Sequence, residues 1–213
     1  MRRALLLLAI LLPATARAGD WVKVKTSQGI TVSKRETGGP VVAFRGEGDV
    51  DAPLDAVATV IFDNTRATEW IADLKASRIV RWTGKDEFLE YDHAGMPPPF
   101  SDRDFVSSVK LETDREYQIV IFRYSPAIDE AVPPVKKYVR GELSSTVFTL
   151  TRLDDGHTHV IAEVQCDPKG YVPKWIVNWV QSEWPETTFK NLRRQVAKKD
   201  IVVDEYFRDA LTR

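Results

Sequence analysis

Two groups of side chains in this sequence have the types and spacing that chemistry requires. His157 and His159 are two residues apart on an expected strand, so both point to one face as a possible metal pair. No third ligand is close in sequence, so we expect no bound metal. His93 lies near Asp92 and Asp104 and could serve in acid–base catalysis. A hydrogen-bonded structural or surface role for His93 is the favoured interpretation.

Other catalytic patterns are absent from the sequence. There is no phosphate-binding glycine loop, no G-x-S-x-G elbow and no H-E-x-x-H helix. Cys166 is the single cysteine, which excludes an intrachain disulfide. It shares strand parity with Val160, Ala162 and Val164, so we expect it to be a small buried apolar group. We therefore predict neither a catalytic residue nor a cofactor.

The N-terminal segment is typical of a secretory signal peptide. Met1-Arg2-Arg3 precedes an apolar run from Ala4 to Leu12, and the segment ends Ala16-Arg17-Ala18. We predict that residues 1–18 are cleaved after Ala18 and that the protein is periplasmic or secreted. A short buried helix is the alternative. The whole chain has a net charge of −1, and cleavage would remove three arginines. A mildly acidic mature protein argues against nucleic-acid binding.

The elements that must position these side chains are strands first and helices last. One helix is expected from Pro53 through Ile61, a second at Thr65–Leu74, and a long one from Pro173 to Val196 that Pro185 should kink or divide. The tail 201–213 could add a short helix. The expected strands are Trp21–Lys25, Ile30–Glu36, Val41–Val50, Ser77–Trp82, Glu87–His93, Arg103–Glu112, Glu116–Tyr124, Tyr138–Thr151 and Thr158–Asp167.

This order predicts an α+β domain. Short turns between strands favour an antiparallel sheet, and a curved sheet around one long helix would leave room for an apolar cavity. The length of 213 residues suits a single domain.

Two segments resemble the START (steroidogenic acute regulatory protein-related lipid transfer) domain family. One is Phe100–Val106, with the arginine-aspartate-aromatic motif Arg103-Asp104-Phe105; the other is Asp167–Trp175, at the entry to the last helix. Val177-Asn178-Trp179 and Lys190–Arg193 extend the likeness, which covers Trp21 to Lys199. The resemblance implies an exported bacterial-type member. Its domain, at residues 19–200, would have the helix-grip fold and an internal hydrophobic tunnel for one lipid.

The resemblance also implies ligand-binding positions. Sterol-carrying members place a buried acid and an arginine in the tunnel, and these positions match Glu90 and Val109 here. The acid lacks its arginine, so Glu90 needs another partner, water or exposure. We expect Arg103 to pair with Asp102 or Asp104, and keep contact with ligand as the alternative.

A loop before the eighth strand commonly gates the tunnel in this family. The matching segment is Ser125–Pro134, which is long and has three prolines. We predict a lid that includes Pro126, Ile128, Val132 and Pro133. An ordinary surface loop is the alternative.

Aromatic side chains could line the tunnel or fill the core. Trp70, Tyr124, Trp175 and Trp179 are the predicted ligand contacts, because the last helix would form one wall. Trp82 and Trp184 are also candidates. A basic run on that helix could face anionic lipid, although a solvated face is favoured; its members are Lys190, Arg193, Arg194, Lys198 and Lys199.

Together these observations predict a monomeric carrier of a lipid or similar hydrophobic molecule. It would exchange ligand during transient contact with a membrane surface and would catalyse no reaction. The alternatives are a cyclase- or hydrolase-like enzyme of the same superfamily and a ligand-sensing interaction module.

Overall fold

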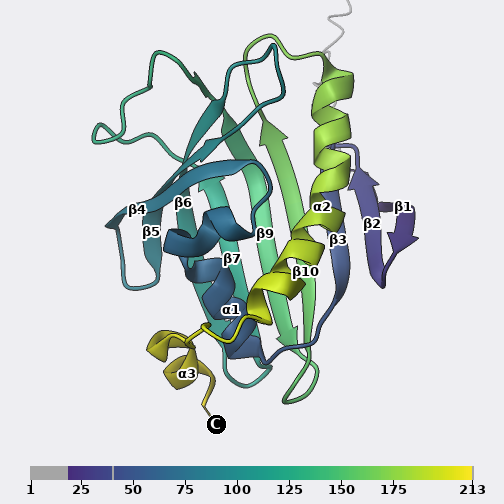
Figure 1. Cartoon of the computed structure of the whole chain (residues 1–213), viewed down its shortest axis with the longest axis vertical. Helices are drawn as coiled ribbons and strands as arrows, with labels where there is room; N and C mark the ends of the chain where they lie inside the picture. Colours follow the sequence, from purple (N-terminus) through teal and green to yellow (C-terminus); the bar gives the residue numbers. More distant parts are fainter. Residues whose placement is uncertain (1–18, 40, 213) are drawn as a thin grey trace, which may run out of the picture.

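A computed structural model describes residues 19–39 and 41–212 of the chain. The predicted signal peptide lies outside the described residues. Figure 1 shows a strongly curved sheet with the long helix α2 lying along its concave side. This arrangement confirms the α+β fold with a helix gripped by an antiparallel sheet.

In residues 19–39 and 41–212 the sheet has ten strands, nine of them in the order β1-β2-β3-β10-β9-β7-β6-β5-β4. Every neighbouring pair in this order is antiparallel, and β8 pairs with β6 in parallel. The strands are β1 (Val22–Ser27), β2 (Ile30–Arg35), β3 (Ala43–Val50), β4 (Leu74–Trp82), β5 (Glu87–Ala94), β6 (Arg103–Asp114), β7 (Ile119–Pro126), β8 (Val139–Arg140), β9 (Glu142–Arg152) and β10 (Thr158–Asp167).

Two expected elements differ from the structure. The strand expected at Tyr138–Thr151 is two strands, β8 and β9, separated at Gly141, whose backbone lies against the ring of Phe105. The helix expected at Thr65–Leu74 is a short 3-10 helix, η1 (Asn64–Glu69). It ends at the C-cap Trp70, and Asp73, with a φ of 61°, lies where the chain turns into β4.

Three α-helices complete the described part of the chain. They are α1 (Leu54–Phe62), α2 (Lys174–Val196) and α3 (Glu205–Leu211). Pro53 is the N-cap of α1, and no side chain caps that helix. Pro185 does not divide α2, although Figure 1 shows the helix bending along its length. The proline is buried against Gly46 of β3, where a side chain on the glycine would collide with it.

The core lies between the concave face of the sheet and the helices. Phe122, Phe148 and Leu150 of the sheet pack with Phe189 of α2 and Phe207 of α3. Strand β10 alternates buried and half-buried residues as expected, with Val160, Ala162 and Val164 directed inward. The concave face is apolar toward the α3 end of the molecule and becomes polar farther along β5 and β6.

Candidate functional site

A pair of carboxyl groups marks the concave face of β5. Glu90 and Asp92 are two residues apart, so they share this face with Phe88. Phe88 is buried and packs edge-on against Phe62 of α1, which places this face toward the interior. Glu90 is buried and lies beside Ser107 of β6 in the sheet register.

The partner of Glu90 is an amide. Asn64, the first residue of η1, donates from Nδ2 to Glu90 Oε2 at 2.7 Å and to Ser77 Oγ at 2.8 Å. Asn64 could not be predicted from the sequence, because a strand pattern does not indicate its contact with Glu90, 26 residues away. The Val109 side chain is fully buried and apolar, so it supplies no charge to Glu90.

Burial controls the protonation of this pair. It raises the pKa of Glu90 well above its ordinary value of 4.5, and the neighbouring Asp92 carboxylate raises it further. Burial also raises the pKa of Asp92. The pKa of the nearby Tyr124 hydroxyl is raised by burial and by these two acids. The two carboxyls therefore hold protons at a pH where exposed acids have lost them.

Buried polar atoms without hydrogen-bond partners include neighbours of this pair and also residues of β9 and α2. Such atoms are costly in a closed interior unless a ligand or water completes them. Among the described residues they include Asn64 Oδ1, Trp70 Nε1, Asp92 Oδ1, Ser107 Oγ, Thr146 Oγ1, Asn178 Oδ1 and Thr188 Oγ1. They come from the sheet, from η1 and its C-cap Trp70, and from α2.

The predicted aromatic contacts separate into two groups. Trp70 is buried and packs edge-on against Phe148, which Tyr124 also contacts. Trp175 and Trp179 of α2 are 71% and 59% exposed. The expectation that these two tryptophans form an inner wall is therefore not met in this conformation, and their contact with ligand stays a prediction.

The expected pairing of Arg103 with a neighbouring carboxylate is wrong. Its guanidinium is buried and donates to the carbonyls of Pro168 at 2.9 Å, Lys169 at 3.0 Å and Ser101. Burial lowers the pKa of Arg103. The residue therefore joins the start of β6 to the segment before α2. Its guanidinium N–H groups donate to backbone carbonyls and not to a carboxylate.

The two acids beside Arg103 have other partners. Asp104 accepts two hydrogen bonds from the Arg140 guanidinium, from Nε at 3.0 Å and from Nη2 at 2.9 Å. Asp102 lies 2.8 Å from both His93 Nε2 and Lys75 Nζ, and these two hydrogen bonds lower its pKa to about 2. His93 therefore pairs with Asp102, which agrees with the favoured hydrogen-bonded role and does not support the alternative of acid–base catalysis with Asp92 or Asp104.

The predicted lid follows β7. Pro126 is the last residue of that strand, and Ile128 is 98% exposed, whereas Val132 is buried. Arg140 donates to the carbonyls of Val132 at 3.3 Å and Pro133 at 3.5 Å. A second contact is made by Asp129, which accepts from Arg81 of β4 at 2.6 Å. These polar contacts hold the segment on both sides of the exposed side chain of Ile128. Its role in gating stays a prediction.

The remaining candidates form no shared site. His157 pairs with Asp154, while His159 pairs with Asp49, and no group of three potential metal ligands exists within residues 19–39 and 41–212. Cys166 is half-buried, and burial raises its thiol pKa to about 12.

The basic run on α2 is mostly engaged by other groups. Arg193 donates to the carbonyls of Asp49 and Gln28, and Lys190 and Lys198 contact carboxylates. Arg194 donates to Asn191. These contacts agree with a solvated, structural helix face better than with a lipid-binding one.

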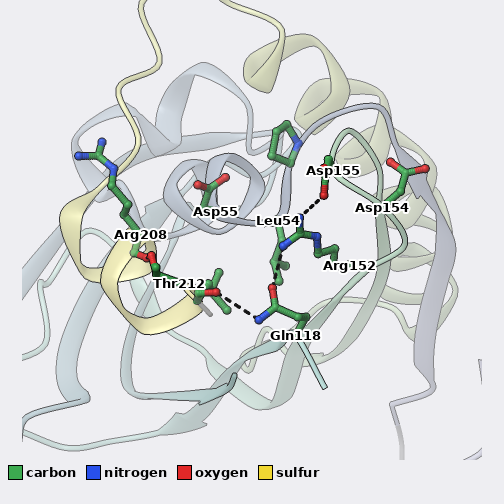
Figure 2. Close-up of a pocket in the computed structure, with 10 residues that line it drawn as sticks. Leu54, Asp55, Gln118, Arg152, Asp154, Asp155, Arg208 and Thr212 are labelled. Atoms are coloured by element: carbon green, nitrogen blue, oxygen red, sulfur yellow. Dashed lines mark hydrogen bonds and ion pairs between the residues drawn. The ribbon is translucent and has the colours of Figure 1, made fainter. Parts of the chain in front are cut away.

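A pocket of about 430 Å³ lies at the α3 end, away from the carboxyl pair. Part of its polar lining is paired, as Figure 2 shows: Arg152 donates to Gln118 at 2.9 Å and also contacts Asp155. Gln118 donates in turn to the carbonyl of Leu211 at 3.2 Å. The pocket therefore has fewer unsatisfied groups than the concave face of the sheet.

The concave sheet closed by one long helix places the chain among helix-grip proteins, and comparison with known proteins names the family. A START domain family model matches residues 6–197. The steroidogenic acute regulatory protein of Gallus gallus is 32% identical over 160 residues, which cover 73% of this chain and 56% of that protein. An uncharacterized protein of Pseudomonas aeruginosa is 25% identical over 185 residues, covering 86% of this chain and 90% of that protein. The chain belongs to the START domain family.

Solved structures agree with this assignment. The STAR-related lipid transfer protein from Xanthomonas axonopodis is 29% identical with a TM-score of 0.73, covering 84% of this chain and 99% of that one. Human StAR-related lipid transfer protein 5 has the same fold, with a TM-score of 0.77 at 21% identity, covering 83% of this chain and 86% of that one.

Proposed function

We propose that this protein binds a lipid or similar hydrophobic molecule between the concave face of the sheet and α2, and carries it without chemical change. The observation that supports this most directly is the set of unpartnered buried polar atoms on the sheet, η1 and α2. A bound molecule with a polar end would complete their hydrogen bonds, while its apolar body would contact Trp70 and Phe148. Membership of a family with lipid transfer proteins supports the same function.

We propose that ligand enters where the lid and the start of α2 meet. Gly170, before α2, lies against Val139 of β8, the next strand after the lid. Figure 1 places the segment after β7 and the first turns of α2 at the same end of the molecule. Ile128 and Tyr171 are 98% and 93% exposed in these segments. Exposed apolar side chains at one end suit a surface that inserts into a membrane interface.

Charge at this end supports membrane contact as well. Lys136, Lys137 and Lys174 are exposed in the same segments as the apolar side chains. Lysines beside aromatic residues favour an interface that contains anionic lipid. No helix among the described residues is long and apolar enough to cross a membrane. Transient docking by this end is therefore the form of membrane contact that we propose.

The N-terminal sequence supports a site of action beyond the inner membrane. The basic start, short apolar run and Ala16-Arg17-Ala18 support export and cleavage after Ala18. We propose that the protein acts as a monomer in the periplasm or outside the cell, where a carrier can cross an aqueous space between two membrane surfaces. Mass spectrometry of the protein from its own cell will test the cleavage, because the mature chain should begin at Gly19.

Analysis of the bound ligand tests the carrier function. The purified protein, extracted with organic solvent, should release an apolar molecule in a stoichiometry near one per chain. The protein should also speed transfer of a fluorescent lipid between donor and acceptor vesicles. Absence of both a co-purified ligand and any uptake of added lipid would contradict the proposal.

A further inference from the structure

The hydrogen-bonding groups around Glu90 contain more acceptors than donors. Asn64 donates to Glu90 and to Ser77, which uses both hydrogens of its amide. Its own Oδ1 and the Oδ1 of Asp92 are buried and accept no hydrogen bond from any described residue. Ser77 lies within hydrogen-bond reach of Asp92. A bound molecule with N–H or O–H donors would therefore complete the hydrogen bonding of Asn64 Oδ1 and Asp92 Oδ1.

The cluster also lacks a positive charge. The groups that act on Glu90 and Asp92 are each other, Asn64 and Ser77, and none of these is basic. In the described part of the chain, no Lys, Arg or His forms an ion pair with either carboxyl. Val109, beside Phe88 in the register, is apolar. Whichever of these two buried carboxyls ionises carries a negative charge that no basic side chain among the described residues in contact with it balances.

We propose that Glu90 and Asp92 bind the protonated amine of an amphiphilic ligand, whose apolar part lies along the concave face. This inference rests on the proposed function, because it names the chemical class of the molecule carried. An ammonium group has three N–H donors and no acceptor, which matches free oxygens on Asn64 and Asp92. Its charge balances that of the carboxyl pair. An alcohol supplies one donor without charge, and a carboxylate supplies none and is repelled.

Three ligands of equal chain length test the inference: dodecylamine, dodecanol and dodecanoate. Each is titrated into the full-length protein at pH 7, below its critical micelle concentration, and affinity is measured by calorimetry. We expect dodecylamine to bind more tightly than dodecanol by about tenfold, and dodecanoate to bind most weakly, because charge-assisted hydrogen bonds exceed neutral ones. Equal or tighter binding of dodecanoate than of dodecylamine would overturn the inference.

Matched variants locate the preference. Asp92→Asn removes the charge with little change in size and should lower the affinity for dodecylamine by about tenfold, while that for dodecanol changes by less than about threefold. Glu90→Gln provides a second variant should the first fold poorly. The control is Glu87→Gln on the same strand, because Glu87 is exposed on the opposite face and bonds Ser108. A preference for amine that survives both inner substitutions would also overturn the inference.

The same titrations separate this inference from the proposed function. Binding of dodecanol and dodecanoate as tight as that of dodecylamine would retain a lipid carrier and overturn only the amine preference. If none of the three ligands binds and no vesicle lipid is taken up, both proposals fail together.

Discussion

The guanidinium of Arg103 donates from Nε to the carbonyl oxygen of Pro168 at 2.9 Å, across 65 residues of sequence. Arg103 begins β6, and Pro168 follows the last strand, just before α2. One buried side chain therefore fixes the place where the long helix leaves the sheet. This is also the end of the molecule where we propose that ligand enters.

Substitution of Arg103 should destabilise the fold strongly. Arg103→Ala would leave the carbonyls of Pro168, Lys169 and Ser101 without their donor in a buried place. We expect a loss of about 3 kcal/mol or more in the free energy of unfolding, measured by urea denaturation. Arg103→Lys keeps the charge but cannot reach three carbonyls at once, so it should restore only part of the loss. If Arg103→Lys is as stable as the wild type, the three simultaneous hydrogen bonds of the Arg103 guanidinium are not needed for stability.

Gly46 of β3 permits α2 to pack closely on the sheet. A Cβ at this position would lie 2.8 Å from Pro185 Cβ and 2.9 Å from the ring of Phe189. Gly46→Ala should therefore displace the helix and cost about 1–3 kcal/mol in thermal or urea unfolding. The control is Gly84→Ala, because an added Cβ there meets only ordinary contact with Glu87 at 3.6 Å. Equal stability of the two variants would show that α2 moves freely to make room.

The local parts of the fold were predictable because they depend on short-range periodicity. Alternation placed Val160, Ala162 and Val164 of β10 inward, and Pro173 marked the start of α2 correctly, at its N-cap. The resemblance to START domains, carried by Phe100–Val106 and Asp167–Trp175, predicted the helix-grip fold. Arg103 lies in the first of these motifs, yet its partners are backbone carbonyls, which no pattern of side chains can reveal.

In the first half of α2 the buried face was not predictable from apolar spacing, whereas farther along the apolar residues Phe189 and Leu192 are buried. The sequence indicates Trp175 and Trp179 as an inner stripe, but the buried face carries Val177, Gln181 and Thr188. Gln181 lies inward because its amide bonds both the N–H and the carbonyl of Cys166. Asn64 was missed in the same way, since its contact with Glu90 depends on how the sheet curves over η1. Apolar periodicity does not identify a buried helix face that carries polar side chains.

The carboxyl pair should make stability depend on pH. Burial raises the pKa of Asp92 and Glu90 in the folded protein above their ordinary values, so the folded state holds more protons than the unfolded one. Their contribution therefore lowers the free energy of unfolding as the pH rises from about 4 through the raised folded pKa values.

Asp92→Asn removes one of these protonation steps and provides the test. Calorimetry of the ligand-free protein gives the melting temperature of Asp92→Asn minus that of the wild type. We expect this difference to be a few degrees larger at pH 8 than at pH 4. In a chain of this size, each kcal/mol corresponds to roughly 2–4 °C. Glu87→Gln, on the exposed face of β5, should give the same difference at both pH values. A constant difference for Asp92→Asn would mean that Asp92 ionises normally in the fold.

The exposed tryptophans of α2 should matter for transfer and little for folding. Trp175 and Trp179 are 71% and 59% exposed, so replacing both with alanine should change the free energy of unfolding by less than about 1 kcal/mol. If they insert into the membrane interface, the double variant should bind anionic vesicles about tenfold or more weakly, because each indole buries apolar area there. Vesicle co-sedimentation measures the binding, and lipid transfer should slow in parallel.

A matched control separates insertion from a general loss of apolar surface. Tyr117 is 66% exposed in the turn between β6 and β7, at the α3 end of the molecule, where no membrane contact is proposed. Tyr117→Ala should leave vesicle binding and transfer unchanged. A loss of transfer with intact vesicle binding in the tryptophan variant would instead assign these side chains to the ligand, as the sequence predicted. Because the two results separate membrane contact from ligand contact, one pair of assays decides what the exposed face of α2 does.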